Sequence, residues 1–145
     1  MKMNDYINEF SNHLREAIEI ANNTTLSPYT KEIRNILICG LGGSGIGGTI
    51  VSDIISSKVN IPIAATKDYS IPNFVNEHTL VIASSYSGNT EETLYALEKC
   101  QEKGAEIAVI TSGGKLKTIA EENKYNKIII PGNQPPRAMF GYAFT

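Results

Sequence analysis

Three hydroxyl side chains, those of Ser85, Ser87 and Thr90, lie close together in the stretch 84–92. The apolar run 80–83 precedes this stretch and apolar residues at helical spacing follow it, so the pattern predicts a strand, a loop and a helix. A helix N-terminus favours an anion, because its first amides lack intrahelical partners and lie at the positive end of the macrodipole. Serine and threonine hydroxyls can also donate to phosphate oxygens. We therefore predict that this loop binds the phosphate of a small phosphorylated metabolite.

Helix capping is the alternative explanation for these hydroxyls, because serine and threonine at a helix N-terminus are the usual capping residues. Capping alone could explain Thr90, and the two glutamates that follow it suit the first turn of a helix as partners of the dipole. A single cap cannot use Ser85, Ser87 and Thr90 at once. Ligand binding is therefore the favoured interpretation of the three hydroxyls together.

A glycine-rich stretch follows the first apolar run and reads Gly40-Leu41-Gly42-Gly43-Ser44-Gly45-Ile46-Gly47-Gly48. Gly40, Gly42 and Gly45 satisfy the dinucleotide pattern G-x-G-x-x-G, and Asp68 follows at about the distance of a ribose-binding carboxylate. Ser44, however, lies in the turn, where it could contact a ligand itself. The stretch 84–92 with its three hydroxyls, called the hydroxyl loop below, also suits a phosphomonoester better than a long ligand. We favour a phosphomonoester, and a dinucleotide-binding Rossmann domain stays the rival hypothesis.

The elements that must position these loops alternate along the chain. Strands are predicted over 35–39, 61–66, 80–84, 105–110 and 127–130, and helices over 46–57, 90–103 and 115–122. This alternation predicts an α/β fold with a doubly wound, five-stranded parallel sheet of flavodoxin-like order 2-1-3-4-5. In that order the chain reverses between the first and third strands, and ligands bind beyond the carboxyl ends of the strands at that point. The glycine-rich stretch 40–48 and the hydroxyl-bearing stretch 84–92 are therefore both expected to border this crevice.

The segments that precede and follow the predicted strands lead to further expectations. Residues 1–30 are predicted to form an N-terminal helix, over 4–22, and a linker, and residues 31–145 to form the α/β domain. Arg137 follows two prolines that restrict where its guanidinium points, so it is either a surface arginine or a site residue. The apolar tail 138–145 ends abruptly, as if a helix were cut while still heading into a core, which predicts that the chain is truncated.

Composition narrows the class of protein. The chain has 145 residues, 41% apolar and 19% charged, with a formal net charge of −2, which is typical of one soluble domain. No basic stripe, membrane-length apolar run or signal-peptide pattern is visible, so we expect a cytoplasmic protein without nucleic-acid or membrane partners. Cys39 and Cys100 are expected to be buried, reduced thiols. His13 and His78 are too few for a histidine-rich metal site, and no metal is expected.

Four motifs together resemble one known family. They read Gly-Leu-Gly-Gly-Ser-Gly-Ile-Gly-Gly from Gly40, Ser-Tyr-Ser-Gly-Asn-Thr-Glu-Glu-Thr from Ser85, Thr-Ser-Gly-Gly-Lys-Leu from Thr111, and Gln-Pro-Pro-Arg-Ala from Gln134. Over about residues 35–142 the chain is similar to the amino-terminal half of bifunctional phosphoglucose/phosphomannose isomerases. These belong to the sugar isomerase (SIS) domain superfamily.

The resemblance implies a substrate and a set of site residues. The substrate-binding positions that it implies are Gly43, Ser44, Ser85, Ser87 and Thr90. Arg137 matches the active-site arginine of the family, which is expected to stabilise an enediolate. The implied reaction interconverts glucose 6-phosphate or mannose 6-phosphate with fructose 6-phosphate. Such proton transfer needs a base, an acid and nearby positive charge, but no cofactor.

One departure from the family pattern is large. The family has two SIS domains, and its catalytic glutamate and histidine lie in the second, which this sequence does not contain. We therefore expect the chain to bind a hexose 6-phosphate weakly and not to isomerise it alone. We also expect it to pair with a second SIS domain or to form a homodimer. The alternative is a phosphosugar-sensing module without catalysis.

Overall fold

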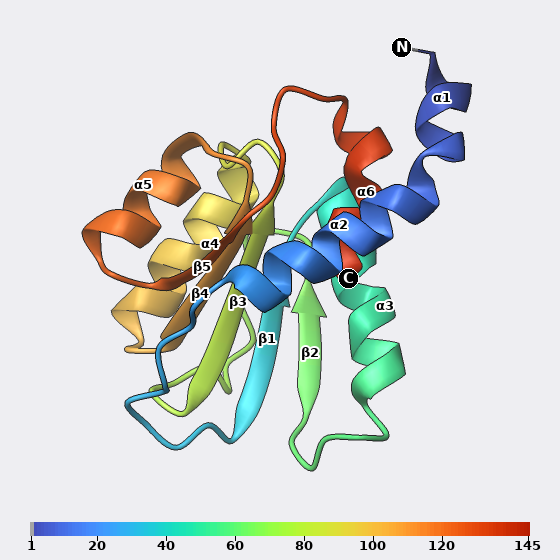
Figure 1. The fold of residues 1–145 in the computed structure, drawn as a ribbon. Coiled ribbons are helices and arrows are strands. Elements are labelled where there is room, and N and C mark those ends of the chain that lie inside the picture. The colour runs from blue at the N-terminus through green and yellow to red at the C-terminus, as the bar shows by residue number, and fades with distance from the viewer. Residues whose placement is uncertain (1) are drawn as a thin grey trace.

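The structure, a computed structural model, describes residues 2–145 (Figure 1). Apolar runs bounded by loops form one sheet with the strands β1 (Asn35–Cys39), β2 (Ile63–Thr66), β3 (Thr79–Ser85), β4 (Glu106–Thr111) and β5 (Asn126–Ile129). The helices are α1 (Met3–Asn8), α2 (Phe10–Asn23), α3 (Gly42–Ile55), α4 (Glu91–Glu102), α5 (Gly114–Glu122), the 3₁₀ helix η1 (Pro136–Met139) and α6 (Phe140–Phe144).

The strands are arranged in the order β2-β1-β3-β4-β5, and every neighbouring pair is parallel. Leu37 of β1 lies beside Ala64 of β2 on one side and Val81 of β3 on the other. The predicted α/β class and the order 2-1-3-4-5 are therefore confirmed. The chain reverses between β1 and β3, so the loops after these two strands border the same crevice.

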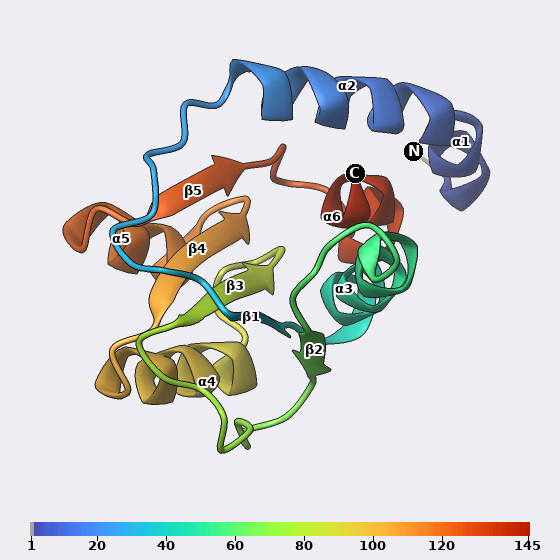
Figure 2. The same ribbon diagram turned by 90° about the horizontal axis from the view of Figure 1, so that it is seen from below.

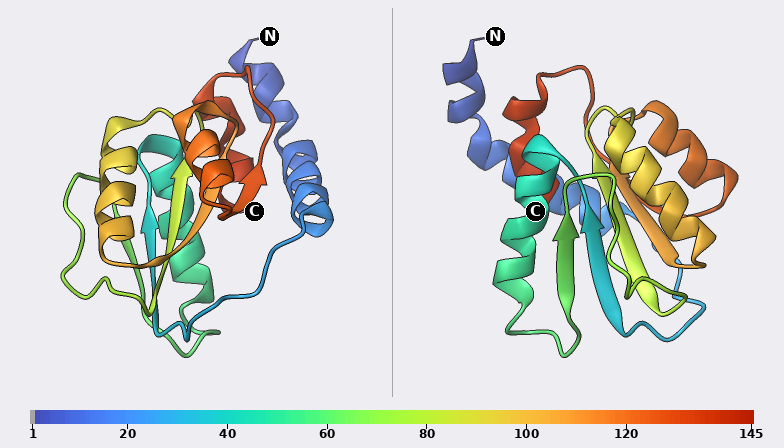
Figure 3. Two further views of the ribbon diagram at one scale, coloured as in Figure 1. Left: turned by 90° about the vertical axis from the view of Figure 1, so that its left-hand side faces the viewer. Right: turned by 180° about the vertical axis from the view of Figure 1, so that it is seen from behind.

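Helices cover both faces of the sheet, as the view along it shows (Figure 2) and two side views confirm (Figure 3). Helices α4 and α5 lie over the larger buried cluster, which consists of Leu37, Cys39, Val75, Val81, Ala83, Ala96, Leu97, Cys100, Ile107, Val109, Leu116 and Ala120. Helices α2, α3 and α6 lie on the other face, where the smaller cluster consists of Ala17, Ile130, Ala138, Met139 and Tyr142. The loops at the carboxyl ends of the strands therefore rest on a core that is packed on both sides.

The N-terminal segment forms two helices, so the prediction of one helix over 4–22 is wrong in this respect. Helix α1 ends just before Glu9 and α2 begins just after it. The bend allows α2 to pack along α6 while α1 reaches η1 (Figure 1). The Tyr142 hydroxyl donates to the Glu16 carboxylate across the α2–α6 contact, and burial, with the Glu16 contact, raises the pKa of Tyr142.

Helix α3 begins at Gly42, about one turn before the predicted start near Ile46. Glycine in a helix interior costs about 1 kcal/mol relative to alanine, which is why the sequence pattern predicted a loop there. Packing outweighs that cost, because a Cβ at Gly47 would lie only 3.0 Å from the carbonyl oxygen of Ala143 in α6. Small residues thus allow α3 and α6 to approach each other closely.

The apolar tail folds back as η1 and α6 onto the domain itself. Ala138, Met139 and Tyr142 are buried there, between α2 and α3. The apolar character of the tail is therefore accounted for by packing within this domain. The same fold-back carries Arg137 to the carboxyl edge of the sheet, which the order of the strands alone does not require.

Both cysteines are free and buried, as predicted. The hydrogen bond to Cys100, together with burial, raises the pKa of Cys39 far above its ordinary value. Within residues 2–145 no group of three or more histidine, cysteine, aspartate or glutamate side chains is arranged to hold a metal ion. None of the described helices combines the length and the hydropathy that a membrane span requires.

Candidate functional site

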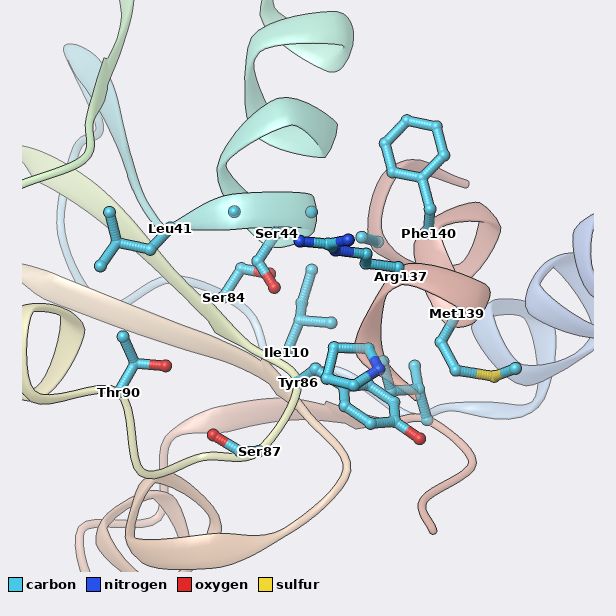
Figure 4. Close-up of a pocket in the computed structure, with 15 residues that line it drawn as sticks. Leu41, Ser44, Ser84, Tyr86, Ser87, Thr90, Ile110, Arg137, Met139 and Phe140 are labelled. Atoms are coloured by element: carbon cyan, nitrogen blue, oxygen red, sulfur yellow. The ribbon is translucent and has the colours of Figure 1, made fainter. Parts of the chain in front are cut away.

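The turn after β1 and the loop after β3 face each other across a cavity of about 300 Å³ (Figure 4). This volume lies at the lower end of the roughly 300–1,000 Å³ that small-molecule sites occupy. The cavity is lined by Leu41, Gly42, Gly43, Ser44, Ser84, Tyr86, Ser87, Thr90, Ile110, Ile130, Pro136, Arg137, Met139, Phe140 and Ala143. Every predicted site residue except Ser85 is among them.

The N-terminus of α3 forms one wall of the cavity. The first intrahelical hydrogen bond of this turn runs from the Gly45 N–H to the Leu41 carbonyl at 3.1 Å, so the amides of residues 42–44 lie in the unpaired first turn. A Cβ at Gly45 would lie 2.7 Å from the carbonyl oxygen of Gly40, so only glycine lets the helix start this close to the strand. The wall therefore combines helix amides, the positive end of the dipole and the Ser44 hydroxyl.

Ser85 stabilises the conformation of the hydroxyl loop through hydrogen bonds within the loop. Its side chain is 3% exposed, and its Oγ lies 2.8 Å from the Thr90 hydroxyl. The same Oγ accepts the Gly88 N–H at 3.1 Å. Ser85 therefore does not line the cavity, and its hydrogen bonds hold the loop in its curved form, whereas its contact with a ligand stays a prediction.

Ser87 and Thr90 do turn toward the cavity (Figure 4). The Ser87 Oγ accepts the Asn89 N–H at 3.2 Å, which leaves its own proton for a ligand. Thr90 occupies the N-cap position of α4 but makes no side-chain capping hydrogen bond. Capping therefore does not account for the Thr90 hydroxyl, which contacts Ser85 and lines the cavity together with Ser87.

The loop after β4 and the first turn of α5 both support the hydroxyl loop through hydrogen bonds. The Leu116 N–H donates to the Gly88 carbonyl at 2.9 Å, and the Lys115 N–H donates to the Asn89 Oδ1 at 3.0 Å. The Ser112 hydroxyl donates to the Tyr86 carbonyl at 2.6 Å. The sequence motif that begins at Thr111 does not by itself indicate this support. The support depends on contacts between distant segments, which no local pattern reveals.

Arg137 supplies the positive charge of the cavity. Its guanidinium extends across the cavity toward Ser44 (Figure 4), and no carboxylate of the described chain lies within ion-pair distance of it. None of the residues that line this cavity is a carboxylate or a histidine. The electrostatic environment thus favours an anionic ligand, and the cavity carries no ordinary general acid or base.

Tyr86 and Ser84 also line the cavity, although the sequence pattern did not single them out. Ser84 is 4% exposed and lies at the end of β3. The alternating burial of a strand gave no reason to separate it from the core. Tyr86 stands between Ser85 and Ser87 in the motif, and that position is the one signal that could have identified it.

Asp68, the residue that the dinucleotide hypothesis needs, is engaged locally. Its Oδ1 accepts the Ser70 N–H at 2.7 Å, closing a turn after β2, and Asp68 does not line the cavity. The glycine pattern is explained by the close approach of Gly45 to Gly40. The glycines and Asp68, the two parts of the dinucleotide pattern, therefore each have a structural role.

Ser85→Ala separates the supporting role of this residue from a binding role. We expect the variant to lose about 1 kcal/mol of unfolding free energy, because two hydrogen bonds to a buried hydroxyl disappear. Ser87→Ala, at an exposed position, should change the stability by less than about 0.5 kcal/mol. Urea unfolding of both variants measures the difference. Unchanged stability of Ser85→Ala would contradict this assignment.

Comparison with known sequences finds a family profile and curated relatives that match most of the chain. The SIS domain profile matches residues 30–145. A bifunctional phosphoglucose/phosphomannose isomerase of Caldicellulosiruptor bescii is 46% identical over 131 residues, covering 90% of this chain and 39% of the relative. A D-glucosamine-6-phosphate 4-epimerase of Sulfolobus acidocaldarius is 41% identical over 119 residues, covering 81% and 37%. The chain spans about two fifths of the length of these relatives.

Comparison with solved structures agrees with the architecture. A Clostridium difficile protein described as a phosphosugar isomerase superposes with a TM-score of 0.78 at 22% identity. The superposition covers 99% of this chain and 43% of that chain. At this level of identity the likeness bears on the fold alone.

Proposed function

The chain belongs to the SIS domain family, and we propose that it forms the substrate-holding half of an isomerase active site. The proposed reaction interconverts glucose 6-phosphate or mannose 6-phosphate with fructose 6-phosphate. The single observation that carries this proposal is the composition of the cavity. Its walls bring together the first amides of α3, several serine and threonine hydroxyls and one arginine, and none of the lining residues is a carboxylate.

Each wall of the cavity has a role in this proposal. The phosphate of the substrate binds to the Ser87 and Thr90 hydroxyls and to the start of α3 at Gly43 and Ser44. Arg137 lies across the cavity, where it stabilises the negative charge of an enediolate at C1–C2. The reaction also needs a group that moves a proton between C1 and C2 and another that opens the sugar ring.

A second SIS domain is proposed to supply that acid and base. This proposal is supported by the lining of the cavity, which includes no carboxylate or histidine, and by the greater length of the curated relatives. The partner is either a further domain of the same protein, following the SIS domain of residues 31–145, or a second copy in a homodimer. We propose that the assembly acts on free hexose 6-phosphates in the cytoplasm.

A sensing module without catalysis is the second candidate, and the same absence of an acid and a base in the described lining favours it. The two functions differ in one outcome. A catalytic half-site gains isomerase activity when a second SIS domain is supplied, whereas a sensor binds the sugar phosphate and gains none. For the chain alone we expect binding without turnover, and Arg137-dependent turnover by the purified chain would contradict this.

Calorimetric titration of the purified chain tests the proposal. We expect fructose 6-phosphate to bind, and Ser87→Ala to weaken binding by about tenfold or more, because it removes a hydrogen bond to a charged oxygen. Ser57→Ala is the matched control, since Ser57 is exposed in the turn after α3 and remote from the cavity. NAD is expected not to bind. Saturable NAD binding that fructose 6-phosphate displaces would instead favour the dinucleotide hypothesis.

A further inference from the structure

Prolines restrict the segment that leads from β5 to Arg137 at both of its ends. Prolines occupy positions 131, 135 and 136, where they restrict the backbone and donate no N–H. The remaining freedom lies in residues 132–134, and Asn133 adopts the left-handed region with φ +62°. The direction in which the chain approaches Arg137 is therefore decided around Asn133 and Gln134.

Gln134 is held at this point by two tyrosines from different segments. Its backbone N–H donates to the Tyr86 phenol oxygen at 3.2 Å. Its side-chain Oε1 accepts the Tyr6 hydroxyl at 2.5 Å. Backbone and side chain of the same residue are thus fixed independently, one from the hydroxyl loop and one from α1.

Tyr86 connects the segment to the phosphate-binding side of the cavity. Its ring lines the cavity, and its hydroxyl points away from Ser87 and Thr90 (Figure 4). Its carbonyl accepts two hydrogen bonds from Ser112, from the N–H at 3.1 Å and from the hydroxyl at 2.6 Å. Tyr86 is therefore anchored at its backbone while its phenol reaches the arginine-bearing segment.

Tyr6 connects the same segment to a part of the chain outside the SIS domain match, which begins at residue 30. Its half-buried side chain packs against the cluster that contains Ala138 and Met139, the residues after Arg137. Helix α1 contacts η1 directly (Figure 1). The N-terminal helices thus reach the element that carries the only cation of the cavity lining.

We infer that Tyr6 and Tyr86 are positioning residues for Arg137. By fixing Gln134, they set where the guanidinium lies relative to the hydroxyls of Ser87 and Thr90. This inference rests on the proposed function for its ligand, and it assigns a role in substrate binding to α1. Neither tyrosine needs to touch the reacting carbons for this role.

The test compares Tyr6→Phe and Tyr86→Phe, each of which removes one hydroxyl and keeps the ring. We expect each to raise the Kd for fructose 6-phosphate about threefold to tenfold, the range of a single hydrogen bond. In the Arg137→Ala background the same substitutions should leave the Kd unchanged, because the tyrosines act through that arginine. Tyr29→Phe, at an exposed linker residue, is the control. It should leave the Kd for fructose 6-phosphate unchanged both in the wild-type chain and in the Arg137→Ala background.

Hydrogen exchange of the ligand-free chain provides a readout that needs no sugar binding. Both phenylalanine variants should speed exchange at Gln134 and Ala138 while leaving Gly88 unchanged. Unchanged Kd values in the single variants, or equal increases in the Arg137→Ala background, would overturn the inference even if Ser87→Ala abolishes binding. If the wild-type chain binds no fructose 6-phosphate, the proposed function fails, whereas faster exchange in the variants would still support the fixing of Gln134.

Discussion

Arg137→Ala should weaken binding of a phosphorylated hydroxamate, which mimics an enediolate, by roughly a hundredfold. The same substitution should weaken binding of fructose 6-phosphate by only about tenfold. The difference arises because the guanidinium is proposed to face the carbons where negative charge develops, whereas the hydroxyl loop binds the phosphate. An interaction that is stronger with the enediolate than with the substrate is the one that accelerates catalysis.

Titration of both ligands into both proteins measures this difference. Arg34→Ala is the matched control, because Arg34 lies just before β1, at the end of the sheet opposite the cavity, and pairs with Glu32 at 2.9 Å. The control should bind both ligands as the wild type does. Equal weakening of the two ligands by Arg137→Ala would show that Arg137 binds the phosphate instead, and the proposed orientation of the substrate would be wrong.

Gly88→Ala should be the most destabilising single substitution in the hydroxyl loop. Gly88 has φ +73°, and a Cβ there would lie 1.8 Å from the carbonyl oxygen of Gly113. The left-handed backbone alone costs alanine about 1–2 kcal/mol, and the contact forces the loop away from its support. We expect a loss of about 2–4 kcal/mol of unfolding free energy and loss of detectable fructose 6-phosphate binding.

Gly113→Ala is the matched control for this substitution. Gly113 lies on the other side of the same contact, its φ of 165° is extended, and nothing lies within 4 Å of its ideal Cβ. Thermal or urea unfolding, followed by titration with fructose 6-phosphate, compares the two variants. If Gly88→Ala were as stable as Gly113→Ala, the close contact between the two loops would be contradicted.

Local patterns were sufficient to predict the sheet and its order. Alternating apolar runs and amphipathic stretches fix which segments are strands and helices, and the handedness of parallel connections restricts their order. The glycines led to a predicted start of α3 that is about one turn too late. The low helix propensity of glycine is a local property, whereas the packing of Gly47 on Ala143, which favours the helix, involves residues that are distant in the sequence. The bend at Glu9 was missed for the same reason, since α1 and α2 contact different elements of the tail.

The candidate site was predictable where its residues share one loop. Ser87 and Thr90 belong to one strand–loop–helix unit, whose geometry follows from the sequence pattern. Ser85 belongs to the same unit, but which hydroxyl turns inward depends on the hydrogen bond to Thr90 and on the Gly88 N–H. The position of Arg137, and the contact of the Tyr86 phenol with Gln134, depend on the folding back of the tail, which short-range periodicity does not describe.

A crystal structure of the chain soaked with fructose 6-phosphate would test the central claim most directly. We expect the phosphate within hydrogen-bonding distance of the Ser87 and Thr90 hydroxyls and of the first amides of α3. The C1–C2 end of the sugar should lie next to the Arg137 guanidinium. A sugar phosphate bound outside this cavity, or bound with its phosphate on Arg137 and its sugar carbons over the hydroxyl loop, would contradict the account.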